Sequence, residues 1–307
     1  MVVLSLFDGI SCGRIALERA GLKVDKYYAS EIKNTAINVT MEHYPDTIQI
    51  GDVTKVHYKD GVLYTERGQF QVGSIDLLMG GSPCQNFSCA TTHLHRTDKY
   101  GLNGDKSRLF YEYLRLKEEI NPKYFLLENV SMKKKSKEEL DRYMGVEGIK
   151  IDSKLVSFQT RNRTYWTNIP GVIPPTDKHT SFQDFKDTNY EYCKQFKVPN
   201  TKSIEQMWNN GMGSKKNNHR ACNNITHADK IGCLTLKQDR APNSGLIEFD
   251  GFCRFLTRRE IELAQTLPIG YTDSLTYNQM QNVCGDGWTV DVIAHIFSFI
   301  PKEDYEN

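Results

Sequence analysis

Residues 75–85 of this 307-residue chain read IDLLMGGSPCQ. The apolar run at 75–79 is typical of a buried strand, and the glycines and Pro83 that follow end that strand in a turn. Open α/β folds bind their ligands at the carboxyl edge of the sheet. The stretch therefore predicts that the Cys84 thiol lies at such an edge, where a thiolate is a strong nucleophile. For Cys84 taken alone, a buried structural cysteine is the alternative.

The segments on either side of this stretch alternate between two hydrophobic patterns. The patterns predict strands at 2–7, 26–30, 47–50, 75–79, 124–127 and 165–169, and helices at 13–20, 35–43, 107–120 and 256–267. The apolar segment at 290–300 favours a helix, with a strand as the alternative. Such alternation indicates a parallel sheet covered by helices. From 171 to 251 the chain is polar and weakly periodic, so we expect a small irregular insert within a large α/β domain.

Composition narrows the class of protein. Hydrophobic residues make up 39% and charged residues 25% of the chain, as in ordinary globular proteins. No apolar run approaches the roughly 18 residues that span a bilayer, so we expect no membrane partner. The net charge of +1 does not indicate nucleic-acid binding by itself. Basic clusters at 133–137, 215–216 and 258–259 leave that possibility open.

Eight cysteines occur singly, without a CxxC pair. In a chain of this length they favour reduced thiols in a cytosol-like compartment. His219, Cys222, His227 and Cys233 fit no standard zinc spacing, so we expect no metal site.

A possible cofactor site follows the first three predicted strands. Residues 7–13 read FDGISCG, and the glycines there allow a ligand to approach the backbone closely. Glu31 ends the second strand and could bind ribose hydroxyls, while Asp52 ends the third and could bind an adenine edge. Together these features indicate a nucleoside-containing cofactor. Each carboxylate alone could equally be a helix cap or a surface group.

Three further charged residues follow later strands. Glu128 comes directly after the apolar run 124–127, and a buried carboxylate is costly unless it is paired or functional. Next to a thiol nucleophile it suggests general-acid or hydrogen-bonding work on a heteroaromatic ring. Arg161 and Arg163 alternate along an extended segment, which predicts that they face one side and bind a phosphate or a carbonyl oxygen. Rim salt bridges are the alternative for the two arginines.

These motifs, in this order, resemble the DNA (cytosine-5) methyltransferases. The likeness is greatest to the catalytic domain of the eukaryotic de novo enzymes and to their phage and bacterial relatives. It is carried by segments 4–10, 28–32, 51–53, 80–85, 128–130, 159–163, 256–265 and 285–290. The resemblance implies a Rossmann-like, doubly wound mixed sheet, the class I fold of methyltransferases that depend on S-adenosylmethionine. It implies a catalytic domain at 1–170 and 256–307 and a target-recognition region at 171–255.

The resemblance also implies an activity and a set of site residues. The activity is methyl transfer from S-adenosylmethionine to carbon 5 of a cytosine flipped out of double-stranded DNA. Cys84 would attack the ring, Glu128 would hold N3 and the amine, Arg163 the carbonyl oxygen, and Arg161 a phosphate or the catalytic loop. Cofactor contacts are expected from Phe7, Asp8, Gly9, Ile10, Ser11, Cys12, Glu31, Ile32, Asp52, Val53, Pro83, Asp286 and Trp288. DNA contacts are expected from Gln85, Ser88, Lys215, Lys216, Arg220, Lys237, Gln238 and Arg240.

Two features depart from the family pattern. Asp286 stands where many bacterial members have asparagine, and no reader domain flanks the catalytic part. The second feature suggests a free-standing cytoplasmic enzyme of a prokaryote or a phage-infected cell, with or without a restriction partner, that needs no other protein. Three alternatives remain open: a transfer-RNA cytosine-5 methyltransferase, a silent DNA-binding relative and, from the glycine loop and Glu31 alone, a nicotinamide oxidoreductase.

Overall fold

The computed structural model describes residues 1–82, 108–202, 204–205, 215–216, 219–220, 222–240 and 243–304, with the backbone alone at 215–216 and 219–220. The chain forms two compact units. The first comprises Met1–Ile151, Asn162–Pro174 and Asp291–Asn307, and the second comprises Asp152–Arg161 and Pro175–Val290. Four predicted site residues lie outside the described residues: Pro83, Cys84, Gln85 and Ser88.

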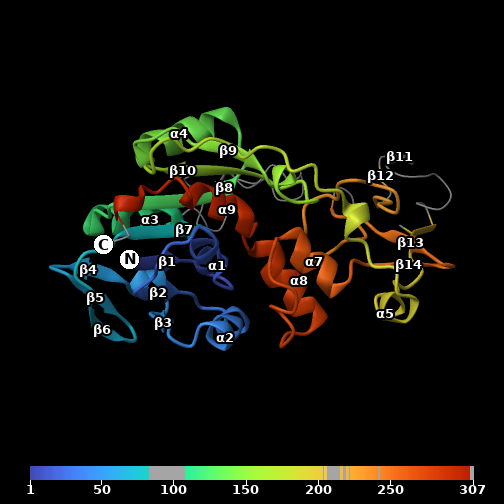
Figure 1. The fold of residues 1–307 in the computed structure, drawn as a ribbon, viewed down its shortest axis with the longest axis horizontal. Coiled ribbons are helices and arrows are strands. Elements are labelled where there is room, and N and C mark those ends of the chain that lie inside the picture. The colour runs from blue at the N-terminus through green and yellow to red at the C-terminus, as the bar shows by residue number, and fades with distance from the viewer. Residues whose placement is uncertain are drawn as a thin grey trace. The chain divides into compact units, whose positions relative to one another are not determined.

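A seven-stranded sheet forms the centre of the first unit, in the order β3-β2-β1-β7-β8-β10-β9 (Figure 1). Its strands are β1 (Val2–Leu6), β2 (Lys26–Ser30), β3 (Ile48–Gln49), β7 (Leu77–Gly81), β8 (Tyr124–Val130), β9 (Ile149–Asp152) and β10 (Asn162–Thr167). The first five in the spatial order run parallel, and β10 runs antiparallel to β8. This mixed, doubly wound sheet confirms the predicted fold class.

The strand order also locates the edge where a ligand would bind. The chain steps outward from β1 to β3 in one direction and from β7 to β8 in the other, so the order reverses between β1 and β7. Open α/β sheets bind ligands at the carboxyl ends of the strands beside such a reversal. The segments that follow β1, β2 and β3, and Ser82 after β7, therefore lie at the edge where a ligand would bind.

Five helices belong to the first unit within the described residues: α1 (Cys12–Arg19), α2 (Asn34–His43), α3 (Arg108–Ile120), α4 (Lys134–Met144) and α9 (Val290–Phe297). Gly21, with φ +75°, ends the turn after α1, and the Leu22 amide donates to the Leu17 carbonyl at 3.0 Å. The last apolar segment is the helix α9, which an Arg19–Asp291 ion pair of 2.6 Å links to α1. No helix in the described part of the chain has the length and hydropathy to cross a membrane.

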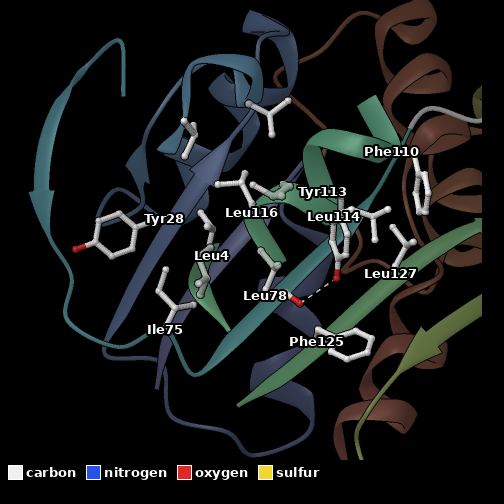
Figure 2. Close-up of a cluster of buried hydrophobic side chains, with 14 of the residues drawn as sticks. Leu4, Tyr28, Ile75, Leu78, Phe110, Tyr113, Leu114, Leu116, Phe125 and Leu127 are labelled. Carbon is white, nitrogen blue, oxygen red and sulfur yellow. Dashed lines mark hydrogen bonds between the residues drawn. The ribbon is translucent and has the colours of Figure 1, made fainter. Parts of the chain in front are cut away.

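The hydrophobic core of this unit lies between α3 and the sheet (Figure 2). Phe110, Tyr113 and Leu116 of α3 are buried against Leu4 of β1 and Leu78 of β7. The Tyr113 hydroxyl donates to the Leu78 carbonyl at 3.5 Å. This packing fixes β7, the strand that leads into the Cys84 segment.

A three-stranded antiparallel sheet, not predicted from the sequence, lies between β3 and β7 in the chain. Its strands are β4 (His57–Lys59), β5 (Val62–Thr65) and β6 (Gly68–Gln71). The short 3-10 turn η1 (Val53–Lys55) leads into it. Only Leu63 among its strand residues is fully buried, so these strands lack the run of buried apolar positions that predicts a strand from sequence.

The second unit is built from short elements and loops. They are η4 (Ser153–Leu155), η5 (Phe182–Asp184), α5 (Tyr190–Lys194), β11 (Lys215–Lys216), β12 (His219–Arg220), β13 (Ile247–Phe249), β14 (Phe252–Arg254), α7 (Arg258–Ala264) and α8 (Tyr277–Asp286). A fully buried Arg254–Glu260 pair with two contacts of 2.8 Å joins β14 to α7. This compact unit extends to Val290, beyond the expected boundary at 255, because α7 and α8 pack within it. Whether it reads a target stays a prediction.

Candidate active site

The loop between β1 and α1 has an unusual backbone. Phe7, Gly9 and Ser11 have φ values of 56°, 60° and 56°, in the left-handed region that non-glycine residues rarely enter. The Asp8 carboxylate holds this path, because it accepts hydrogen bonds from the Tyr27 hydroxyl at 2.6 Å and the Ser11 hydroxyl at 2.5 Å. Asp8 therefore stabilises this conformation of the loop.

Burial affects the ionisation of this pair. It raises the pKa of the Asp8 carboxyl above its usual value of 3.8, and the hydroxyls of Ser11, Ser5 and Tyr27 oppose that shift in part. The pKa of Tyr27 is raised well above 10.0, again chiefly by burial, with the Asp8 charge adding to it. Tyr27 therefore stays protonated and serves as a hydrogen-bond donor at all ordinary pH values.

Glu31, just beyond β2, binds the same loop. Its carboxylate accepts from the Gly9 amide at 2.9 Å, and from the Ile32 and Lys33 amides at 2.8 and 2.9 Å. It thus joins the glycine loop to the start of α2. Ile32 beside it is 70% exposed, an apolar side chain free of burial at the edge where a ligand is expected.

Asp52 lies in the turn after β3. Its side chain accepts from the Thr54 amide at 2.9 Å and so caps η1. Gly51 before it has φ +82°, and its carbonyl accepts from the Ser30 hydroxyl at 2.7 Å. The turn that would carry an adenine-reading carboxylate is therefore held from the neighbouring strand.

These residues fit a nucleoside-containing cofactor. Carboxylates lie after β2 and β3, and Ile32 offers an apolar surface. Apart from Gly9 and its two chain neighbours, no atom of the described residues lies within 4 Å of the point where a Cβ on Gly9 would stand. Four predicted contacts do not fit, because the whole residues are buried: Ile10 (0%), Ser11 (0%), Cys12 (3%) and Val53 (4%). They support the loops and do not present atoms to a ligand.

An ion pair stands at the carboxyl end of β8. The Arg163 Nε lies 2.9 Å from Glu128 Oε1, with side chains 15% and 11% exposed. The antiparallel register places Arg163 opposite Val130 and Tyr165 opposite Glu128. The contact with Arg163 offsets part of the desolvation free energy of the buried Glu128 carboxylate, so Glu128 is a paired residue.

The segment that leads to Cys84 leaves the sheet beside this ion pair. Gly81 of β7 pairs with Glu128 of β8 in the parallel ladder. The Asn129 amide donates to the Ser82 hydroxyl at 3.1 Å, and both residues are buried. Asn129 thus holds the last described residue before the Cys84 segment.

Arg161 has a different environment from Arg163. It is 4% exposed and belongs to the second unit, where its guanidinium donates to the carbonyls of Gly285 and Gly287 at 3.0 and 2.8 Å and contacts the Cys233 sulfur at 3.2 Å. The guanidinium therefore braces the turn that carries Asp286. These contacts of Arg161 lie within the second unit, whereas Arg163 pairs with Glu128 in the first, so a common ligand for the two arginines stays a prediction.

The remaining candidates also lie in the second unit. Asp286, the last residue of α8, is exposed, and Trp288 is half-buried. Lys237 and Arg240 are exposed, as a DNA contact requires. Lys215, Lys216 and Arg220 lie in the two-stranded β11–β12 ladder, of which the backbone alone is described.

Gln238 contradicts its predicted role as a base reader. It is 1% exposed, and its amide nitrogen donates to the Tyr277 hydroxyl at 3.0 Å and to the side-chain oxygen Oε1 of Gln281 at 2.8 Å. Its oxygen accepts from the Leu256 amide at 2.9 Å. Every usual bond of the side chain is satisfied inside the unit, so Gln238 anchors the loop that presents its neighbour Lys237.

Residues 1–145 match the family model described as C-5 cytosine-specific DNA methylase. This part of the chain is therefore similar to the C-5 cytosine methylases. The match covers the glycine loop, Glu31, Asp52 and Glu128, the residues whose geometry has just been described.

The curated relatives agree with the family. The chain is 36% identical over 127 residues to DNA (cytosine-5)-methyltransferase DRM1 of Arabidopsis thaliana, across 39% of this chain and 19% of that protein. It is 33% identical over 131 residues to the type II methyltransferase M.NgoBV of Neisseria gonorrhoeae, across 41% and 27%. It is 27% identical over 219 residues to the orphan methyltransferase M.Rho11sI of Bacillus phage rho11s, across 67% and 40%. The matches thus span from about a fifth to two fifths of these relatives' lengths.

Solved structures support the fold over nearly the whole chain. The S. pombe Dnmt2 methyltransferase aligns with a TM-score of 0.66 at 16% identity, over 97% of both chains. A Dnmt2 variant from Spodoptera frugiperda aligns with 0.65 at 15% identity. At such identities the likeness establishes the fold and leaves the substrate open.

Two supporting groups were not predicted from the sequence. Tyr27 supports Asp8 from the middle of β2, and Glu66 reaches the Asp52 amide from the small sheet. Tyr27 reads as an ordinary strand residue, and Glu66 as an exposed turn residue. No local signal marks either, because each acts on a loop far from it in the chain.

Proposed function

We propose that this protein methylates carbon 5 of cytosine in double-stranded DNA, with S-adenosylmethionine as the methyl donor. The observation that carries the proposal is the Glu128–Arg163 ion pair. Glu128 pairs with Gly81 at the end of β7, three residues before Cys84 in the sequence, within the part of the chain that is similar to the C-5 cytosine methylases. Cys84 follows Ser82 by two positions in the sequence, and the proposal assigns it the role of nucleophile.

In the proposed reaction the Cys84 thiolate adds to carbon 6 of the cytosine ring. This addition breaks the aromaticity and makes carbon 5 electron-rich enough to take the methyl group. Glu128 binds N3 and the exocyclic amine and so favours the charge that develops there. Arg163 orients Glu128 and binds the carbonyl oxygen. Loss of the proton from carbon 5 and expulsion of the thiolate complete the cycle.

When bound, S-adenosylmethionine supplies an electrophilic methyl group. The residues of this chain that would hold the cofactor are Phe7, Asp8, Gly9, Glu31, Ile32 and Asp52, with Pro83, Asp286 and Trp288 as further candidates. The Glu31 carboxylate would accept hydrogen bonds from the ribose hydroxyls, and the Asp52 carboxylate would accept one from the adenine amine. The Ile32 side chain would pack on the face of the base.

The target base must leave the duplex, because carbon 6 cannot be reached by a thiol while the base is stacked. Lys237 and Arg240, both exposed in the second unit, would bind the phosphate backbone, with Lys215, Lys216, Arg220, Gln85 and Ser88 as further candidates. Bacterial and phage relatives support action in the cytoplasm of such cells.

A transfer-RNA substrate is the second candidate, because the fold neighbours at 15–16% identity leave the polymer open. The decisive experiment offers DNA, transfer RNA or no polymer with tritiated S-adenosylmethionine. The proposal predicts label in DNA, located at 5-methylcytosine after digestion to nucleosides. Label in transfer RNA alone would establish the alternative, and no label in either would refute methyl transfer.

A further inference from the structure

The small sheet β4–β6 is fixed firmly to the rest of the first unit. Leu63 of β5 is fully buried in the main core, and the Phe70 ring of β6 packs edge-on against the Tyr28 ring of β2, with centroids 6.0 Å apart. The Glu119 carboxylate of α3 accepts from the Tyr58 amide of β4 at 2.8 Å. The sheet therefore has a defined place relative to β2 and β3.

Its turn between β5 and β6 is equally well ordered. Thr65 pairs with Gly68 across the turn, and the Thr65 hydroxyl donates to the Gly68 carbonyl at 3.0 Å. The two residues between them are Glu66 and Arg67, both exposed. Such a two-residue turn holds its backbone in one conformation, so the side chain of Glu66 starts from a fixed position.

Glu66 ends at the turn that carries Asp52. Its Oε1 accepts from the Asp52 amide at 2.9 Å. A Cβ built on Gly51 would stand 2.2 Å from the same oxygen, so the glycine leaves the space that the carboxylate fills. With the Ser30 hydroxyl on the Gly51 carbonyl, this turn is held on both sides, from β2 and from the small sheet.

We propose that Glu66 is a positioning residue of the cofactor site, which fixes the Asp52 turn for recognition of the adenine amine. The inference rests on the proposed use of S-adenosylmethionine. Without the Glu66 acceptor, the Asp52 amide loses this bond, and the turn keeps its contacts to Ser30 and Thr54 but is no longer held from the small sheet by Glu66. A recognition group that must be ordered upon binding gives weaker affinity and poorer discrimination.

Calorimetric binding of S-adenosylhomocysteine to the full chain tests the inference. Glu66→Ala should weaken binding roughly two- to ten-fold, the worth of one hydrogen bond. Glu66→Gln retains an acceptor oxygen and should bind as the unmodified protein does. Arg67→Ala, in the same turn, is the matched control and should change neither affinity nor melting temperature.

A second ligand separates positioning from general stability. S-inosylhomocysteine carries an oxygen in place of the adenine amine, so a well-placed Asp52 should reject it. Glu66→Ala should reduce the preference for the adenosine ligand, whereas a purely structural effect would weaken both ligands alike. An unchanged affinity and an unchanged preference in Glu66→Ala would overturn the inference. If the unmodified protein bound neither ligand, the proposed cofactor itself would fail.

A double-substitution cycle gives an independent check. Gly51→Ala would push its methyl group into the place of the Glu66 carboxylate, in addition to the strain at φ +82°. The two substitutions damage the same contact, so the loss of affinity in Gly51→Ala with Glu66→Ala should be smaller than the product of the separate fold-losses. Independent, multiplying losses would contradict the assignment.

Discussion

At the scale of single residues, the Glu128–Arg163 ion pair is the feature with the clearest chemical consequence. Glu128→Gln keeps the size of the side chain and one acceptor for Arg163, but it cannot pass a proton toward N3 as the thiolate adds negative charge to the ring. We expect single-turnover methylation to slow by at least about 100-fold, the lower range for a general acid.

The control for this substitution is Glu147→Gln, whose carboxylate is 88% exposed in the same unit. It should leave the rate unchanged, and binding of S-adenosylhomocysteine should stay normal in both variants. A Glu128→Gln protein with the unmodified rate would remove Glu128 from the mechanism.

Asp8 gives a prediction about pH. Its pKa is raised in the folded state by burial, so the folded protein holds this proton more tightly than the unfolded chain does. Unfolding releases it, and the free energy of unfolding must therefore fall as the pH rises from 3.8 through the raised pKa. Below 3.8 the group is protonated in both states and contributes no slope.

Asp8→Asn cannot ionise, and should not show this fall. Urea denaturation of the two proteins across the acid range should give a stability difference that moves in favour of the Asn variant as the pH rises, then levels off. Asp60→Asn, at an exposed turn, is the control and should run parallel to the unmodified protein. A difference that stays constant through this range would show that Asp8 is not perturbed.

At the scale of elements, α7 and α8 both begin with a capping box, and they differ in burial. Thr257 is fully buried and its hydroxyl also contacts Asp187, while Thr276 is exposed. Thr257→Ala should lower the free energy of unfolding by about 2 kcal/mol and Thr276→Ala by about 0.5 kcal/mol, the two ends of the range for such caps. Urea denaturation would measure both. Equal costs would mean that the Asp187 contact contributes nothing.

Elements were predictable where their own sequence carries the pattern. The β2 strand and the Thr257–Glu260 cap match the expectation because a short strand-like run and a capping box are patterns of neighbouring residues. The helix α4 and the small sheet were missed, since Lys133–Lys137 reads as a basic cluster and α4 buries only Leu140 and Met144. The burial of Gln238 and the bonds of Arg161 depend on partners far along the chain, which no local pattern reveals.

At the scale of the whole molecule, the two compact units divide the proposed work. The first holds the cofactor loops and the Glu128–Arg163 ion pair, and the second holds the exposed Lys237 and Arg240. The boundary of the second unit was not predictable from composition. For example, the Gln159 side chain donates to the Ala264 carbonyl at 3.0 Å and accepts from the Leu234 amide at 2.9 Å. These hydrogen bonds join segments that differ in hydrophobic pattern and lie far apart in the chain.

The DNA contacts proposed for this unit predict a particular salt dependence. Lys237→Ala and Arg240→Ala should each weaken DNA binding evenly across sequences and reduce the slope of log affinity against log salt by about 1. Lys23→Ala, at a side chain 82% exposed in the first unit, is the control. Fluorescence anisotropy at several salt concentrations would measure the slopes. Slopes equal to that of the unmodified protein would show that Lys237 and Arg240 do not contact the DNA phosphates.

The most direct test of the central claim is covalent trapping on DNA that contains 5-fluorocytosine. Fluorine at carbon 5 cannot leave as a proton does, so an enzyme that adds a thiolate at carbon 6 and transfers a methyl group remains attached. We predict a complex stable to detergent that forms only with S-adenosylmethionine, maps to Cys84 by mass spectrometry and is absent from Cys84→Ala. A Cys84→Ala protein that still methylates DNA, or an unmodified protein that forms no adduct while methylating DNA, would contradict the account.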